Sequence, residues 1–102
     1  MSMTVIVTRD VDDRYRGFLS SVMLEISPGV YTSPRLSKGV RERIWAVMCE
    51  WHAALGRGSI VMTWKSVDAP GGQGLVHLGE PPRELLEVDG MVVVRRGNGP
   101  SV

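Results

Sequence analysis

The chain has 102 residues, of which 43% are hydrophobic and 23% charged, and its formal net charge is +1. This length and composition are typical of one globular domain, and they exclude an extended disordered chain. With so small a net charge, nucleic-acid binding has to be argued from the positions of individual arginines rather than from the total.

Periodicity and turn residues divide the chain into strands and helices. Runs of β-branched residues such as TVIVT predict strands, whereas apolar residues at spacings of three and four predict helices. Asp12 and Ser37 are candidate N-caps, Pro28-Gly29 and Ser33-Pro34 are breaks, and the glycines after Leu55 end the second helix. In chain order we expect a strand over 4–8, a helix over 13–26, a short strand over 30–32, a helix after Ser37, and strands over 59–64, 75–78 and 91–94.

This order predicts an α+β domain over 1–94 with the ferredoxin-like βαββαβ plan and an additional C-terminal strand. Residues 95–102 have nothing to bury, so we expect a flexible tail. No apolar run approaches the ~20 residues of a membrane-spanning helix, and the start MSMTVIVTRD lacks the long apolar centre of a signal peptide. Cys49 is the single cysteine and permits no internal disulfide, which fits the cytoplasm.

An antiparallel sheet with both helices on one face would leave its other face bare in a single copy. Val5, Val7, Ile60 and Met62 are too apolar for water if they lie on that face. We therefore expect a homodimer that buries strands of the sheet together with the segment 87–94.

Several segments carry a family resemblance through their order and spacing. They are SMTVIVTRDV, RYRGFLSSVMLEISPGVYTS, VRERIWAVM, SIVMTW and EVDGMVVV. The specific features are R-x-R-G at the start of the first helix, LE-x-x-x-GVY at its end, and IW in the second helix. Over nearly its whole length the chain resembles the Cas-two family of CRISPR-associated proteins, in its I-E subtype.

The resemblance implies a homodimer of ferredoxin-like subunits sandwiched between two pairs of an integrase partner, of the Cas-one family. Such a dimer would hold a short prespacer duplex of foreign DNA for insertion beside the repeats of the CRISPR array. The implied function is a DNA-binding adaptor for spacer acquisition. One alternative is a metal-dependent endonuclease acting on RNA or DNA. Another is an RNA-binding module, which is disfavoured because the strands TVIVT and SIVMTW display aliphatic residues where such a module stacks bases on aromatic ones.

Arg14 and Arg16 lie in the first turn of the predicted first helix. Cations there oppose the positive end of the helix dipole by ~0.3 to 1 kcal/mol each, so their placement works against local stability. Free backbone amides and guanidinium groups together form an anion site, which would explain the cost. The residues alone slightly favour solvated arginines offset by Asp12 and Asp13, whereas the resemblance implies DNA-backbone contacts at both positions.

Arg83 follows Pro81-Pro82 in a predicted connector, where two prolines would stiffen the chain. The resemblance implies a backbone-contacting arginine here, although relatives often have a pair. An ordinary charged loop residue is an equally good interpretation.

Asp10 is the candidate catalytic and metal-binding residue. The resemblance implies a carboxylate at the end of the first strand that faces its symmetry mate and holds a divalent ion such as Mg²⁺. In the I-E subtype that acid matches Arg9 of this chain, and the nearest acid is displaced by one residue, which turns a side chain to the other face of a strand. We therefore expect no required cofactor and favour a structural role, with Mg²⁺-dependent hydrolysis as the alternative.

Other chemistry-bearing residues have structural interpretations. Cys49 and His52 supply only two ligands, which do not make a metal site, and His77 stands alone. The basic cluster Arg35, Lys38, Arg41 and Arg43 is interpreted as a solvated face paired with Glu42. Core or interface packing is the interpretation for Trp45, Trp51 and Trp64.

Overall fold

The computed structural model describes residues 2–79, 83–88 and 91–96, with side chains described for residues 2–79. Its elements are β1 (Ser2–Arg9), α1 (Asp13–Val22), β2 (Leu24–Ser27), β3 (Val30–Leu36), α2 (Lys38–Leu55), β4 (Ser59–Lys65), the 3-10 helix η1 (Pro70–Gly72), β5 (Gln73–Leu78), β6 (Arg83–Val88) and β7 (Met91–Arg96). The chain is therefore α+β, and the order from β1 to β4 is βαββαβ, as its sequence predicts. β5 is an additional strand of the same sheet, and β6 and β7 follow it.

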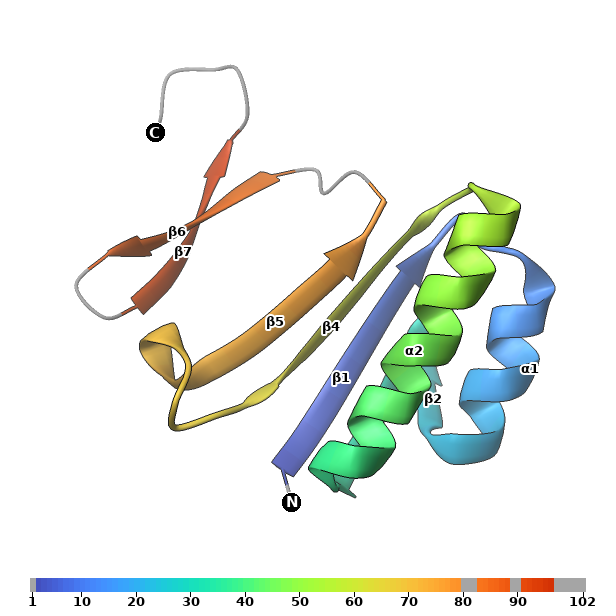
Figure 1. The fold of residues 1–102 in the computed structure, drawn as a ribbon, viewed down its shortest axis with the longest axis horizontal. Coiled ribbons are helices and arrows are strands. Elements are labelled where there is room, and N and C mark those ends of the chain that lie inside the picture. The colour runs from blue at the N-terminus through green and yellow to red at the C-terminus, as the bar shows by residue number, and fades with distance from the viewer. Residues whose placement is uncertain (1, 80–82, 89–90, 97–102) are drawn as a thin grey trace.

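The five strands β1 to β5 form one antiparallel sheet in the order β2-β3-β1-β4-β5. β1 lies in the middle and hydrogen bonds to β3 on one side and β4 on the other (Figure 1). Among the described strands, β5 pairs with β4 alone, so it extends the sheet at one edge. β6 and β7 pair with each other as a separate two-stranded sheet.

Both predicted helix caps are confirmed. The Asp12 carboxylate accepts a hydrogen bond from the backbone N–H of Arg14 at 2.9 Å, and the Ser37 hydroxyl accepts one from Val40 at 3.2 Å. Gly56 ends α2 with a φ of 63°, a left-handed conformation that glycine adopts without a steric penalty. These caps fix where each helix starts relative to the strand before it.

The prediction of one helix over 13–26 is wrong at its C-terminal end. α1 stops at Val22, and Leu24–Ser27 forms strand β2, which pairs with the beginning of β3. The apolar spacing continued into this segment, but pairing with β3 across the Pro28-Gly29 turn decides its conformation. The turn is held against β1, because the Gly29 carbonyl accepts hydrogen bonds from the Thr8 N–H at 2.7 Å and the Thr8 hydroxyl at 3.1 Å.

Pro34 does not end β3, contrary to the sequence-based expectation. The strand continues to Leu36, and its register with β1 shifts between Ser2 and Thr4, opposite Pro34 and Arg35. Pairing with β2 extends only as far as Thr32. A proline is tolerated here because it lies at an irregularity on a stretch with one neighbouring strand.

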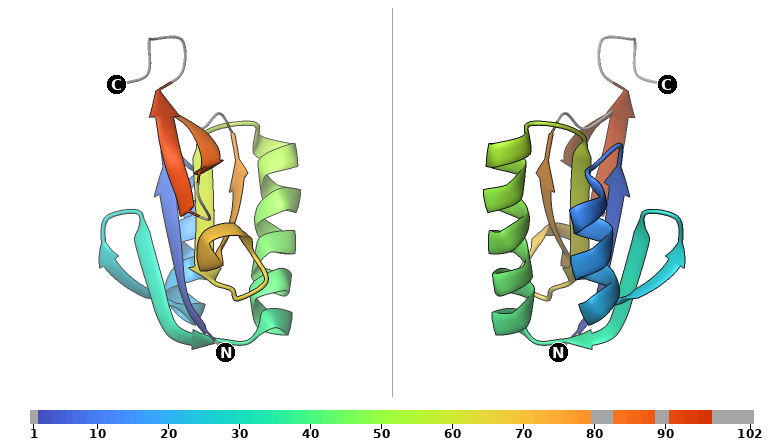
Figure 2. Two further views of the ribbon diagram at one scale, coloured as in Figure 1. Left: turned by 90° about the vertical axis from the view of Figure 1, so that its left-hand side faces the viewer. Right: turned by 90° about the vertical axis from the view of Figure 1, so that its right-hand side faces the viewer.

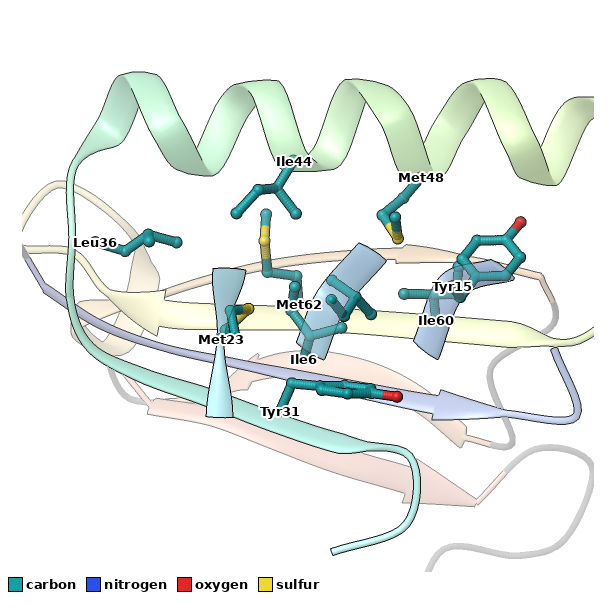
Figure 3. Close-up of a cluster of buried hydrophobic side chains, with 10 residues drawn as sticks. Ile6, Tyr15, Met23, Tyr31, Leu36, Ile44, Met48, Ile60 and Met62 are labelled. Atoms are coloured by element: carbon teal, nitrogen blue, oxygen red, sulfur yellow. The ribbon is translucent and has the colours of Figure 1, made fainter. Parts of the chain in front are cut away.

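The core lies between the sheet and both helices. Its fully buried apolar side chains come from β1 (Ile6), α1 (Tyr15, Leu19), β3 (Tyr31), α2 (Met48) and β4 (Ile60, Met62). Figure 3 shows Ile6, Met48 and Ile60 with their neighbours between α2 and the strands, and Figures 1 and 2 show α1 and α2 side by side. Both helices therefore cover the same face of the sheet.

Within residues 2–79, no helix covers the other face of the sheet, and the structure corrects which residues lie on it. Val5 and Val7 alternate with Ile6 and lie on this face, whereas Ile60 and Met62 are buried beneath the helices. The exposed apolar side chains on or beside this face are Met3 at 54%, Val7 at 42%, Leu24 at 66% and Ile26 at 59% exposure.

The C-terminal strands are longer than predicted. β5 begins at Gln73 instead of Leu75, and β7 includes Arg95 and Arg96, which the sequence assigned to the tail. Residues 97–102, and the side chains of the segment 87–94, lie outside the described part of the protein. Among the described helices, none combines the length and the hydrophobicity that crossing a membrane requires.

We expect Tyr15→Phe to stabilise the fold. Tyr15 is fully buried at the edge of Trp51, with ring centroids 5.4 Å apart, and within residues 2–79 its hydroxyl has no hydrogen-bond partner. Removing this unsatisfied hydroxyl should raise the free energy of unfolding by about 1 kcal/mol, because the ring contact is kept. Urea unfolding measures the change.

Tyr31→Phe is the matched control for this prediction. The Tyr31 hydroxyl is bonded to Glu25, so its loss should destabilise the protein. A lower urea midpoint for Tyr15→Phe would contradict the assignment of an unpartnered hydroxyl.

Candidate nucleic-acid interface

The junction between β1 and α1 positions three candidate site residues, which are Asp10, Arg14 and Arg16. β1 ends at Arg9, and Asp10 then adopts a φ of 58°, which is uncommon for a residue other than glycine. The loop after α2 supports this turn. Arg57 Nε donates a hydrogen bond to the Asp10 carbonyl at 3.2 Å, and a side chain at Gly58 would overlap the Arg9 and Asp10 carbonyls.

His52 contacts the same loop, which fits the structural role predicted from the sequence. Its Nε2 atom lies 3.1 Å from the Gly58 carbonyl, a hydrogen bond that ties α2 to the loop following it. Within residues 2–79, no three His, Cys, Asp or Glu side chains are grouped in a way that could hold a metal ion. Cys49 is half-buried and His77 is exposed.

Arg14 lies on the side of α1 that faces α2. Its Nε atom is 3.8 Å from Asp12 Oδ1, and its guanidinium carbon is 5.6 Å from the centre of the Trp51 ring. The Arg14 side chain is 51% exposed. An acidic residue and an aromatic face therefore offset part of the unfavourable dipole interaction, while the guanidinium keeps access to solvent.

Arg16 lies toward β2, on a different side of the helix from Arg14. Its Nε atom donates to Glu25 Oε1 at 3.1 Å, and its side chain is 72% exposed. Glu25 Oε2 accepts from the Gly29 N–H at 3.2 Å. The hydrogen bond from Gly29 and the Arg16 guanidinium hold the pKa of Glu25 below its usual value.

Tyr31 completes this group from the neighbouring strand. Its hydroxyl is bonded to Glu25, and burial, with a smaller contribution from the Glu25 charge, raises the pKa of Tyr31. Glu25 had not been singled out from the sequence. The LE-x-x-x-G spacing was the available signal, since it places a carboxylate four residues before the glycine of a tight turn.

Asp10 lies on an open hollow beside Arg16. The hollow is lined by Thr8, Asp10, Val11, Asp12, Asp13, Arg16, Glu25, Pro28, Gly29 and Tyr31. Asp12 caps α1 and Glu25 binds Arg16, so two of these carboxylates already have partners. A divalent ion prefers several oxygen ligands, and the donors among residues 2–79 do not fit such a site.

The ladder of β1 explains the different positions of Arg9 and Asp10. Arg9 is the last paired residue, opposite Ser59, and by alternation it belongs to the uncovered face with Val5 and Val7. Asp10 lies beyond the ladder, in the turn. The expectation that a shift of one residue turns the side chain to the other face of the strand therefore does not apply, because Asp10 is no longer part of the strand.

Arg83 is not in a connector. It is the first residue of strand β6, and its side chain lies outside the described part of the chain. Arg14 and Arg16 both lie in the first turn of α1. The contact between Arg83 and the DNA backbone stays a prediction.

The basic cluster around the start of α2 is only partly a solvated face. Arg35, Lys38 and Arg43 are exposed, but Arg41 is half-buried with its guanidinium carbon 4.3 Å from the centre of the Trp64 ring. Within residues 2–79, no ion pair joins this cluster to Glu42.

The three tryptophans pack against the core, as predicted from the sequence. Trp51 contacts Tyr15 and Phe18 edge to face, at centroid distances of 5.4 and 5.5 Å. Trp64 lies against Gly74, where a larger residue would overlap the indole ring. Arg57 and the Arg41–Trp64 contact were not foreseen, because both depend on segments far apart in sequence.

Comparison with known protein families places the site in context. Residues 3–93 match the family described as CRISPR-associated protein (Cas_Cas2CT1978). The match includes β1 from Met3 onward, both helices, the turn at Gly29 and the hairpin of β4 and β5. The chain therefore belongs to this Cas2 family, which is associated with type I-E CRISPR systems.

Proposed function

We propose that this protein acts in CRISPR spacer acquisition as a homodimeric, DNA-holding adaptor in the cytoplasm. The dimer bridges two pairs of a Cas-one-family integrase, holds prespacer duplex DNA and presents it for insertion at CRISPR repeat DNA. The observation that carries the proposal is a pair of exposed arginines, Arg14 and Arg16, held at the start of α1 in a member of this family.

The uncovered face of the sheet supports the homodimer. Met3 and Val7 are about half exposed and Leu24 is two-thirds exposed, which is unfavourable for apolar side chains that face water. A second copy offers the same apolar surface, as a two-fold interface requires. Two α1 helices then supply two sets of arginines related by symmetry.

The position of the arginines supports recognition of the DNA backbone. Guanidinium groups pair with phosphate oxygens, and the first turn of a helix adds free N–H donors and a favourable dipole. Such contacts carry no base information, which suits a protein that has to accept foreign DNA of any sequence.

A metal-dependent nuclease acting through Asp10 is the alternative. Two of the carboxylates near Asp10 have other roles, since Asp12 caps α1 and Glu25 binds Arg16, and within residues 2–79 no group of His, Cys, Asp or Glu side chains could hold a metal ion. The adaptor role requires no cofactor, and we therefore favour it.

Val7→Lys should convert the dimer into a monomer. A charged side chain would be buried in the proposed interface, which opposes association. Val67→Lys is the control, because Val67 is 86% exposed in the loop after β4 and lies outside the sheet. Sedimentation at micromolar concentration should show a dimer for the wild type and for Val67→Lys, and a monomer for Val7→Lys. A monomeric wild type would remove the proposal of a dimer.

Arg14→Ala combined with Arg16→Ala should weaken duplex binding by the complex with the integrase. Each phosphate contact contributes ~0.9 to the slope of log affinity against log salt, so the slope should become shallower by ~2 to 4 units in a dimer. The loss should be equal across DNA sequences. Because each arginine has an acidic neighbour, we expect a small change in melting temperature rather than the gain suggested by the dipole alone.

Arg35→Ala combined with Arg43→Ala is the charge-matched control for that measurement. Both residues are exposed and lie away from the start of α1. An unchanged slope in the Arg14 and Arg16 variant, or an equal change in the control, would assign the DNA path to another surface.

Asp10→Asn should leave integrase-dependent spacer insertion nearly unchanged. Asparagine tolerates the positive φ at this position, whereas Asp10→Ala would add backbone strain to the loss of the carboxylate. Insertion is measured in vitro with purified complex. A fall of two or more orders of magnitude in Asp10→Asn would identify Asp10 as a catalytic ligand.

A further inference from the structure

Glu25 connects three parts of the protein that surround Arg16. One carboxylate oxygen accepts from Arg16 Nε at 3.1 Å, and the other accepts from the backbone N–H of Gly29 at 3.2 Å. The Tyr31 hydroxyl also bonds to this carboxylate. Glu25 is thus anchored at a tight turn and at a neighbouring strand, independently of its contact with the arginine.

The contact uses the Nε edge of the Arg16 guanidinium. Within residues 2–79, Glu25 is the one hydrogen-bond partner of that group, so the two Nη atoms keep four N–H donors for another ligand. The two side chains differ sharply in accessibility, because Glu25 is 18% exposed and Arg16 is 72% exposed. The negative charge therefore faces the protein, and the free donors of the arginine face solvent.

Arg14 provides an internal comparison. Its pairing with Asp12 spans 3.8 Å, and both side chains are about half exposed. The two arginines of the same helical turn are therefore held differently: Arg14 loosely, and Arg16 through a hydrogen bond to an anchored acid.

We propose that Glu25 is a positioning residue for Arg16. It holds the guanidinium by Nε so that the Nη edge is presented to a phosphate of the DNA backbone, an inference that rests on the proposed function. A long arginine side chain loses conformational freedom when it binds, and holding it beforehand reduces that loss. Glu25 therefore strengthens DNA binding although it carries the same charge sign as the DNA.

The test is a double-mutant cycle on the full-length protein assembled with its integrase, with a synthetic DNA duplex as the probe at fixed salt. Glu25→Gln should weaken binding about three- to tenfold in the Arg16 background and have no effect in the Arg16→Ala background. Glu50→Gln, an exposed residue of α2, removes the same charge and should leave affinity unchanged.

Each outcome distinguishes the inference from the proposed function. If Arg16→Ala weakens binding and Glu25→Gln does not, or strengthens it, the positioning role is overturned while the adaptor function stands. An equal loss from Glu25→Gln in both backgrounds also overturns the positioning role, because the effect does not pass through Arg16. If Arg16→Ala keeps wild-type affinity, the proposed DNA contact fails and the inference fails with it.

Arg16→Lys tests the same point without altering Glu25. Lysine keeps the charge and loses the Nε donor and the planar fork, so the turn at Gly29 keeps its carboxylate partner. We expect affinity close to that of Arg16→Ala, with an unchanged melting temperature. Wild-type affinity in Arg16→Lys would show that the held orientation is not used, and this result stands even if Glu25→Gln fails to fold.

Discussion

The two hydrogen-bonded ladders of β1 are the constraint on which the rest of the structure depends. β1 pairs with β3 and β4, so both hairpins of the sheet are aligned on this one strand. Its Ile6 is fully buried in the layer between the strands and both helices. The end of β1 then fixes where α1 begins. The arginines proposed to bind DNA are therefore positioned by the central strand rather than by a flexible loop.

The sequence predicted those parts of the fold whose signals are local. Asp12 and Ser37 were identified as caps because a short polar side chain before an apolar repeat can accept a hydrogen bond from a free N–H of the first helical turn. The segment after Val22 was assigned wrongly because its apolar spacing suits a helix and a strand equally well. Only pairing with β3, across a turn that is itself bonded to Thr8, separates the two conformations. That information lies in contacts distant along the chain.

In the candidate site, too, the local features were predicted from the sequence and the contacts between distant segments were not. Arg14 and Arg16 were found from their place at a helix start, and the resemblance to a family gave them a role. Asp12 was named as a neighbour of Arg14, but the partner of Arg16 was not found, because Glu25 reaches Arg16 only after α1 ends early and β2 folds back beside it. Arg57 likewise meets the Asp10 carbonyl through the end of α2. Residue types can be recognised from sequence, but their pairing depends on the backbone path.

Pro34 makes the outer side of β3 unsuited to further strand pairing beyond the end of β2. Proline has no N–H to donate, and the register shift opposite it bends the strand locally. β2, the outermost strand on this side, has four residues and an irregularity of its own between Glu25 and Ser27. A short, bulged edge followed by a proline resists the edge-to-edge association that leads open sheets to aggregate. This margin of the sheet is therefore protected against uncontrolled growth by features that cost the domain few hydrogen bonds.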